Sequence, residues 1–255
     1  MAEKVIVENV EVNDAVQRAK GFWAKFSKPI TYAGSAIILL IGGWYAYKVF
    51  YKAPKDLKAS ELVFPAEKLF GKMAAISSFS KDSVNTVLNG GILEGEKVTG
   101  LLTIIKNYGG TPSANRAEYI AGACYLQLGE FDKAISHLKE FNGNGAHQIE
   151  SKAYLLLGHA YAEQKKTDEA LSYYKKSAEV LSDKDGDQKV VALFNAASYA
   201  EWAGKNKDAI ELLTSLKDNF GNVLSRRGNQ YGGTPPPPVS EDDVEKLLAK
   251  LGVTK

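Results

Sequence analysis

Apolar residues follow two different patterns along the 255-residue chain. From Pro29 to Tyr47 no charged residue interrupts them, whereas beyond Leu57 they recur at the three- and four-residue spacing of amphipathic helices. Strand-like alternation and hairpin dipeptides between β-branched runs are missing from this second part, so we expect no strands in it. The pattern predicts an all-α protein, with a single N-terminal transmembrane helix followed by a stack of helices.

The uncharged stretch is long enough to cross a bilayer. Its 19 residues would rise about 28 Å as a helix, close to the roughly 30 Å of hydrocarbon in a membrane. Tyr32 lies near one end and Trp44 near the other, which is typical of membrane interfaces. The residues that we expect to contact membrane lipid are Ile37, Ile38, Leu39, Leu40, Ile41 and Trp44.

Two alternative interpretations of this stretch are a buried core helix and a cleaved signal peptide. Lys and aromatic residues outside both ends argue against the core helix. Four acidic residues before the stretch, and no small-x-small cleavage site after it, argue against the signal peptide. Charge does not orient the span, because four Lys or Arg residues from Arg18 to Lys28 flank it on one side and four Lys residues from Lys48 to Lys58 flank it on the other.

Three windows of the second part superpose, namely 115–138, 151–174 and 190–213. Their matched columns hold small residues, Tyr residues and Ala residues at equal intervals, and the offsets between windows are 36 and 39 residues. The columns are Gly122, Gly158 and Ala197; Tyr125, Tyr161 and Ala200; and Ala134, Ala170 and Ala209. This pattern resembles the tetratricopeptide repeat (TPR), which implies a TPR-like α-solenoid in which small residues let two antiparallel helices cross.

The chain therefore divides into five predicted segments. They are an N-terminal tail (1–28), a transmembrane helix (29–50), a TPR-like helical domain (51–222), a Gly/Pro-rich linker (223–239) and a C-terminal amphipathic helix (240–255). Within the helical domain, 65–79 and 100–108 predict a leading helix pair separated by a loop around Asn89. The C-terminal helix, capped by Ser240, either covers the last apolar face of the solenoid or binds a partner.

The first helix of each repeat should line a concave groove. Counting from the matched Tyr/Ala column places these residues there: Arg116, Tyr119, Ala123, Leu126, Lys152, Leu155, His159, Ala162, Val191, Phe194, Ser198 and Glu201. TPR domains that clamp acidic tails carry Lys and Asn at two of these positions in each repeat, which here hold Tyr119 and Ala123, and Leu155 and His159. The mixture of apolar and polar side chains favours apolar or extended segments, with Tyr119 and Phe194 as anchors. Alternatively, neighbouring helices or the C-terminal segment cover some of these residues.

The composition and the residue spacing favour a protein-binding function and argue against catalysis. A net charge of +2 and a single basic pair at 226–227 argue against nucleic-acid binding. The three His residues have no metal-ligand spacing, and Cys124 is the sole cysteine, in a position that suits a small packed residue. We therefore expect no catalytic residue, metal or cofactor.

The order of anchor and repeats, together with the run from Gly109 to Ile135, resembles the YfgM-like inner-membrane proteins of Gram-negative bacteria, in particular their Bacteroidota relatives. The resemblance implies an ancillary subunit of the SecYEG translocon that is paired with the membrane-anchored chaperone PpiD. It also implies unfolded client polypeptides, a cytoplasmic N-terminus and a periplasmic TPR domain.

Two alternatives remain open. The protein could be a structural scaffold of another cell-envelope complex, such as a secretion or motility machine, with no client in its groove. It could also be an anchored adaptor whose body faces the cytoplasm.

Overall fold

The computed structural model describes residues 2–93, 95–225 and 238–253, with side chains from residue 16 onward apart from that of residue 93. The chain divides into two compact units at Leu57. Most of the predicted linker, residues 226–237, lies outside the described residues.

The N-terminal unit is helical throughout its described length. Helix α1 spans Ala2–Ala46, a π-helical segment (η1) spans Tyr47–Lys52, and α2 begins at Ala53. Pro29 lies inside α1, so the helix continues across the expected boundary between the tail and the span.

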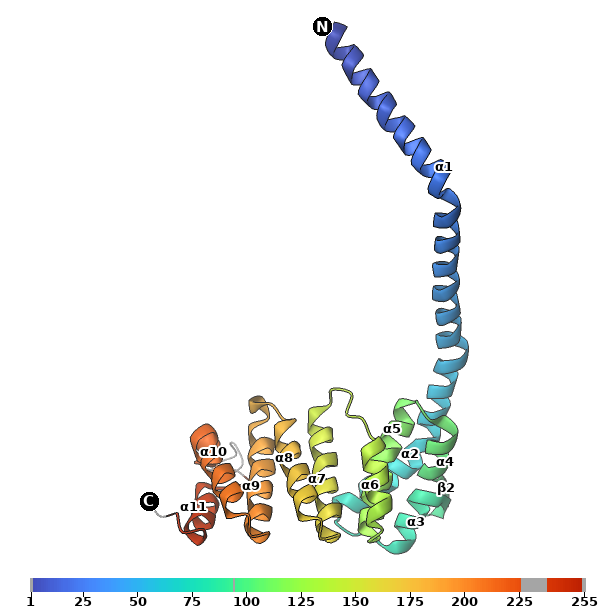
Figure 1. The fold of residues 1–255 in the computed structure, drawn as a ribbon. Helices are drawn as coiled ribbons and strands as arrows, with labels where there is room; N and C mark the ends of the chain where they lie inside the picture. The colour runs from blue at the N-terminus through green and yellow to red at the C-terminus, as the bar shows by residue number, and fades with distance from the viewer. Residues whose placement is uncertain (1, 94, 226–237, 254–255) are drawn as a thin grey trace, which may run out of the picture. The chain divides into compact units, whose positions relative to one another are not determined.

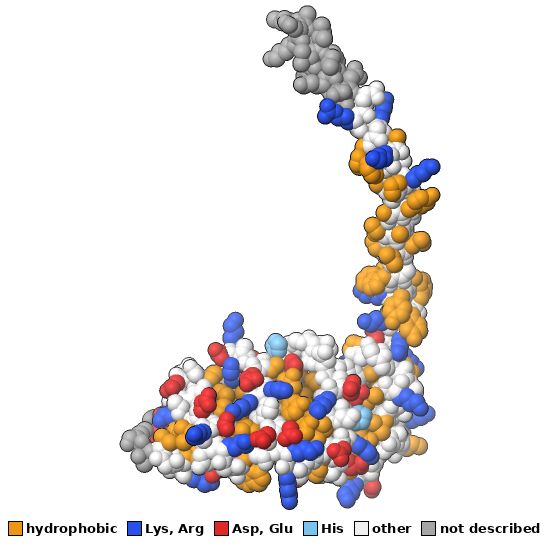
Figure 2. Space-filling view, in the orientation of Figure 1, with side chains coloured by type: hydrophobic (Ala, Val, Ile, Leu, Met, Phe, Trp, Pro, Cys, Tyr) orange, Lys and Arg blue, Asp and Glu red, His pale blue; other side chains and the backbone are white. Residues whose placement is uncertain are grey.

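The apolar stretch of α1 exposes side chains around its whole circumference. The residues predicted to contact lipid, from Ile37 to Trp44, are more than half exposed, and Figure 2 shows hydrophobic side chains along this helix. The hydroxyls of Thr31 and Ser35 donate hydrogen bonds to backbone carbonyls one turn earlier, at 2.7 and 2.5 Å, which satisfies them without water. Within the described residues, one helical stretch is long and apolar enough to cross a membrane, consistent with a single span.

The second unit begins with a more elaborate entry than the sequence predicts. Helix α2 (Ala53–Ala75) runs from the first unit into the second and is followed by α3 (Lys81–Asn89), strands β1 (Gly90–Leu93) and β2 (Glu96–Thr99), and α4 (Leu101–Tyr108). The two strands form an antiparallel hairpin in which Gly90 pairs with Thr99. The expectation of no strands is therefore wrong at this hairpin, and α2 begins well before the predicted residue 65.

The body beyond α4 is a row of antiparallel helix pairs, which confirms the predicted TPR-like solenoid. The pairs are α5 (Pro112–Gln127) with α6 (Phe131–Glu140), α7 (His147–Glu163) with α8 (Thr167–Glu179), and α9 (Gly186–Trp202) with α10 (Asn206–Leu224). Figure 1 shows them as neighbours in chain order. Each pair crosses at the predicted small residues, and Ala134, Ala170 and Ala209 are fully buried.

The last pair is completed by elements that flank the repeats. A 3₁₀ turn (η2, Asp183–Asp185) leads into α9, and α11 (Glu241–Lys250) packs its Val244 and Leu248 on α9 and α10. The hydroxyl of Ser240 accepts a hydrogen bond from the Asp243 backbone N–H while the Asp243 carboxylate accepts one from the Ser240 backbone N–H. Of the two roles expected for the C-terminal helix, the structure shows the covering one.

Candidate partner-binding groove

The predicted groove residues lie on α5, α7 and α9, the first helices of the three pairs. Arg116, Lys152 and His159 are exposed, and most of the others are half-buried. Ala123 is buried, so it contributes to packing instead of to a surface. The groove assignment as a whole stays a prediction.

A hollow of about 310 Å³ lies between α7 and α9. Three predicted groove residues, Lys152, Leu155 and Val191, line it. The residues that sequence reasoning missed there are Gln148, Ser151, Ser177, Asp187, Gln188, Ala192, Asn195 and Pro238. The hollow thus combines aliphatic side chains, three amide side chains and one charge of each sign.

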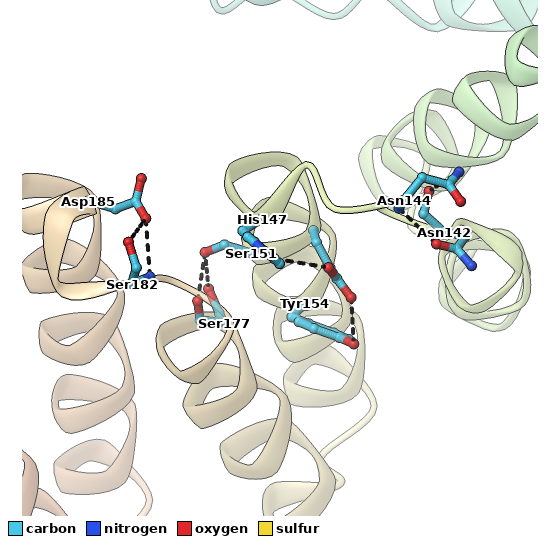
Figure 3. Close-up of polar contacts among 9 residues, drawn as sticks. Asn142, Asn144, His147, Ser151, Tyr154, Ser177, Ser182 and Asp185 are labelled. Carbon is cyan, nitrogen blue, oxygen red and sulfur yellow. Dashed lines mark hydrogen bonds and ion pairs between the residues drawn. The ribbon is translucent and has the colours of Figure 1, made fainter. Parts of the chain in front are cut away.

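A buried hydroxyl pair holds the wall of this hollow in place. The Ser151 hydroxyl donates to the Ser177 backbone carbonyl at 2.7 Å, and the two hydroxyl oxygens are 3.0 Å apart (Figure 3). At the start of α7, the Gln148 amide donates to Asp185 at 3.0 Å. That bond, together with the bonds from Ser182, holds the pKa of Asp185 below its ordinary value. These bonds tie α7 to both α8 and the turn before α9, so the hollow is preorganised.

The groove residues of the first repeat are engaged inside the molecule. The Arg116 guanidinium pairs with Glu67 of α2 at 2.8 Å. Tyr119 lies against Phe141, with ring centroids 5.4 Å apart, and burial raises the pKa of its phenol. One groove residue of the third repeat is also engaged inside the molecule, because Glu201 of α9 pairs with Lys250 of α11 at 2.7 Å. The sequence-based alternative that other elements cover part of the wall therefore applies to these positions.

Four aromatic rings form a continuous row across α7, α8 and α9. His159 shares a 2.8 Å hydrogen bond with Tyr174, whose ring lies 4.8 Å from that of Tyr199, which in turn lies 5.5 Å from Trp202. Desolvation lowers the pKa of His159, so its imidazole is neutral at pH 7, and it raises the pKa of Tyr174 to about 12. Trp202 is 71% exposed.

Of this aromatic row, only His159 was predicted as a groove residue. Tyr174, Tyr199 and Trp202 occupy ordinary positions of amphipathic helices, and nothing in their spacing joins them. The one available signal was Trp202 itself, because a large aromatic residue beside the turn Ala203-Gly204 is unlike the Gln127 and Glu163 of the matching column.

Comparison with known proteins supports the repeat architecture. The family model for subunit 3 of the anaphase-promoting complex (cyclosome) matches residues 102–177, which is less than a third of the chain. The match extends from α4 to α8 and so includes two of the three helix pairs. Together with the row of helix pairs, this match supports a tetratricopeptide-repeat-like architecture for the body. A search of curated proteins finds no match.

Proposed function

From a tetratricopeptide repeat body joined to one long apolar helix, we propose that this protein is a membrane-anchored, non-catalytic module. It holds segments of other polypeptides in the groove along α7 and α9. The observation that carries this proposal is the hollow of about 310 Å³ between these helices. Its volume is at the lower end of the range for ligand sites, about 300–1,000 Å³.

The chemistry of the hollow suits an extended polypeptide. Leu155 and Val191 offer aliphatic surface for one side chain of the bound segment. Gln188 and Asn195 each carry an amide that both donates and accepts hydrogen bonds. A peptide backbone needs the same combination, because every residue presents one N–H donor and one C=O acceptor.

Anchoring makes weak binding sufficient. A groove tethered to the membrane encounters membrane-associated partners at an effective concentration that reaches the millimolar range for short flexible connections. A site of this kind therefore works with modest affinity and releases its partner quickly.

The resemblance to YfgM-like proteins supports a finer proposal. We place the protein beside the SecYEG translocon, in a bacterial inner membrane, with its N-terminus in the cytoplasm and its repeats in the periplasm. There it would hold a PpiD-like chaperone or unfolded client polypeptides emerging from the channel. The support for this placement is the sequence run from Gly109 to Ile135 and the order of anchor and repeats.

The groove is tested by changing its polarity while keeping its volume. Leu155→Asn combined with Val191→Thr should reduce the recovery of partner proteins when the full chain is purified from membranes in mild detergent. Leu62→Asn with Val223→Thr makes the same chemical changes at half-buried positions outside the hollow and should leave recovery unchanged. Equal recovery with both double variants would overturn the groove assignment.

The membrane partner is tested separately with a photo-crosslinking residue at positions from Ala36 to Gly43. Adducts with subunits of the translocon support the Sec assignment, and adducts with other envelope proteins favour the scaffold alternative.

The orientation is tested with Ser136→Cys, which places a thiol at an exposed position of α6. A membrane-impermeant maleimide should label it in spheroplasts; protection until lysis would place the body in the cytoplasm.

A further inference from the structure

The aromatic row at the end of the groove has an acidic neighbour. Glu163 is the last residue of α7, and its negative charge favours a higher pKa for both His159 and Tyr174. Within the described part of the chain Glu163 forms no ion pair, whereas Glu201 on α9 is already paired with Lys250. The neutral imidazole of His159 adds no positive charge.

Other tyrosines of the repeat body have lysine ammonium groups lying over their rings. Lys176 lies 4.8 Å from the ring centroid of Tyr173, and Lys139 and Lys166 lie 5.4 and 5.7 Å from that of Tyr161. By contrast, no Lys or Arg of the described residues lies over Trp202 or over the two tyrosines of the row. The nearby Lys205 is engaged with Asp168 at 2.6 Å. Lys205 also lies close enough to Tyr199 to act on its phenol, and Tyr174 is only 5% exposed, so the part of the row that is open to a partner is the Trp202 ring, over which no cation of the described residues lies.

We propose that the exposed Trp202 ring at the end of this row, backed by Tyr199 and Tyr174, binds a Lys or Arg side chain of the polypeptide segment held in the groove, together with the Glu163 carboxylate. This inference rests on the proposed function and names the chemistry of its partner. Trp is the best aromatic acceptor for a cation, and its exposed ring on α9 is open to one. A carboxylate beside the rings adds charge complementarity, which selects a basic side chain over an acidic one.

The separation of the two sites predicts a spacing in the partner. Leu155 lines the hollow, and Glu163 follows it on the same helix eight residues later, which is about 12 Å at 1.5 Å per residue. An extended chain rises about 3.3 Å per residue, so it covers this distance in about four residues. The preferred segment therefore has an aliphatic residue in the hollow and a Lys or Arg about four residues away.

The test uses the full chain in mild detergent and two fluorescein-labelled peptides. Both have a Ser/Gly background with one Leu, and the first has an Arg about four residues from it, while the second has Gln in its place. Binding is followed by fluorescence anisotropy. The wild-type chain should bind the Arg peptide about tenfold more tightly, a difference of about 1.4 kcal/mol.

Variants of the row should remove this preference without removing binding. With Trp202→Ala or Glu163→Gln, the ratio of the two affinities should fall to about twofold or less. Phe64→Ala is the matched control, because Phe64 is also an exposed aromatic residue (63%) on a helix of the same unit, and it should keep the full ratio.

The outcomes separate the two levels of the proposal. Equal binding of the two peptides by the wild-type chain, or an unchanged ratio in both variants of the row, would overturn the cation site while leaving the groove in place. Failure of the wild-type chain to bind either peptide would count against the groove itself and therefore against both.

Discussion

Gly122 leaves less room for a side chain than Gly158, the other glycine at a helix crossing, so Gly122→Ala is the sharper test of the packing. A Cβ atom at this position would lie 2.5 Å from Cγ and 2.9 Å from Cδ2 of Leu138, and 3.2 Å from the carbonyl oxygen of Ala134. Real Cβ contacts are essentially never shorter than 3.0 Å. Leu138 is 2% exposed and lies within the main core, so its side chain has little room to move away.

The size of the effect follows from two opposing terms. Overpacking a buried position costs about 1–3 kcal/mol, whereas replacing Gly by Ala within a helix stabilises it by about 1 kcal/mol. Because three atoms surround the added methyl group and one of them is backbone, we expect a net loss of about 1–2 kcal/mol. Gly71→Ala in α2 is the matched control: no atom lies within 4 Å of its added Cβ, so it should gain about 1 kcal/mol.

The assay is urea denaturation of the full chain in one detergent, followed by far-ultraviolet circular dichroism. The dependence of the unfolding free energy on urea concentration should be unchanged, while the urea concentration at the midpoint should fall for Gly122→Ala and rise for Gly71→Ala. Adding Leu138→Ala to Gly122→Ala should cost less than the sum of the two single changes, because the smaller side chain makes room for the methyl group. A midpoint that rises for both single variants would refute the crossing geometry.

The remaining predictions concern single groups of the body. Cys124 is buried with its pKa raised to about 12, so it should not react with thiol reagents in the native chain at pH 8 but should react in denaturant; equal rates would contradict this burial. The buried Tyr199 hydroxyl lacks a hydrogen-bond partner among the described residues, so Tyr199→Phe should leave the free energy of unfolding unchanged or raise it by up to about 1 kcal/mol, and a clear loss would reveal a partner. Ser240→Ala should cost about 1 kcal/mol at pH 7 by uncapping α11. Hydrogen bonds from Ser240 lower the pKa of Asp243, so this stabilisation is present above about pH 4 and is lost as the pH falls through the lowered value, which thermal unfolding across pH would detect.

Repeat positions were predictable because they tolerate few residues. Gly122 and Gly158 face Leu138 and Tyr174 so closely that a side chain does not fit without a shift, and such positions recur at the repeat period. The cap at Ser240 was predictable for a similar reason, since Ser followed by Asp three residues later satisfies helix N–H groups locally.

The hairpin of β1 and β2 was not predictable in this way. Its strands have four residues each, too few for an alternating pattern to stand out, and Gly90 and Gly91 resemble a loop. In the folded chain α3 ends at Asn89 and β2 returns along β1, burying Val98 in the main core. The packing of that one side chain is a tertiary effect, which local composition does not indicate.

The proposed binding surface was likewise predictable only in part. Counting repeat positions placed Leu155 and His159 on the groove side of α7, but it did not reveal that Arg116 pairs with Glu67 or that Lys250 reaches Glu201. The aromatic row joins residues from three helices, and His159 and Tyr174 are 15 positions apart. Contacts of this kind depend on side-chain directions, which repeat spacing does not specify.

The sequence by itself determined the long apolar helix, the small residues at the helix crossings and the order of the repeat pairs, because each follows from interactions between residues close in the chain or from a strict limit on size. Only the tertiary structure decided the hairpin, the hollow between α7 and α9, the row of rings and the covering role of α11. These features arise where distant side chains meet, and their free energy depends on packing that no local pattern encodes.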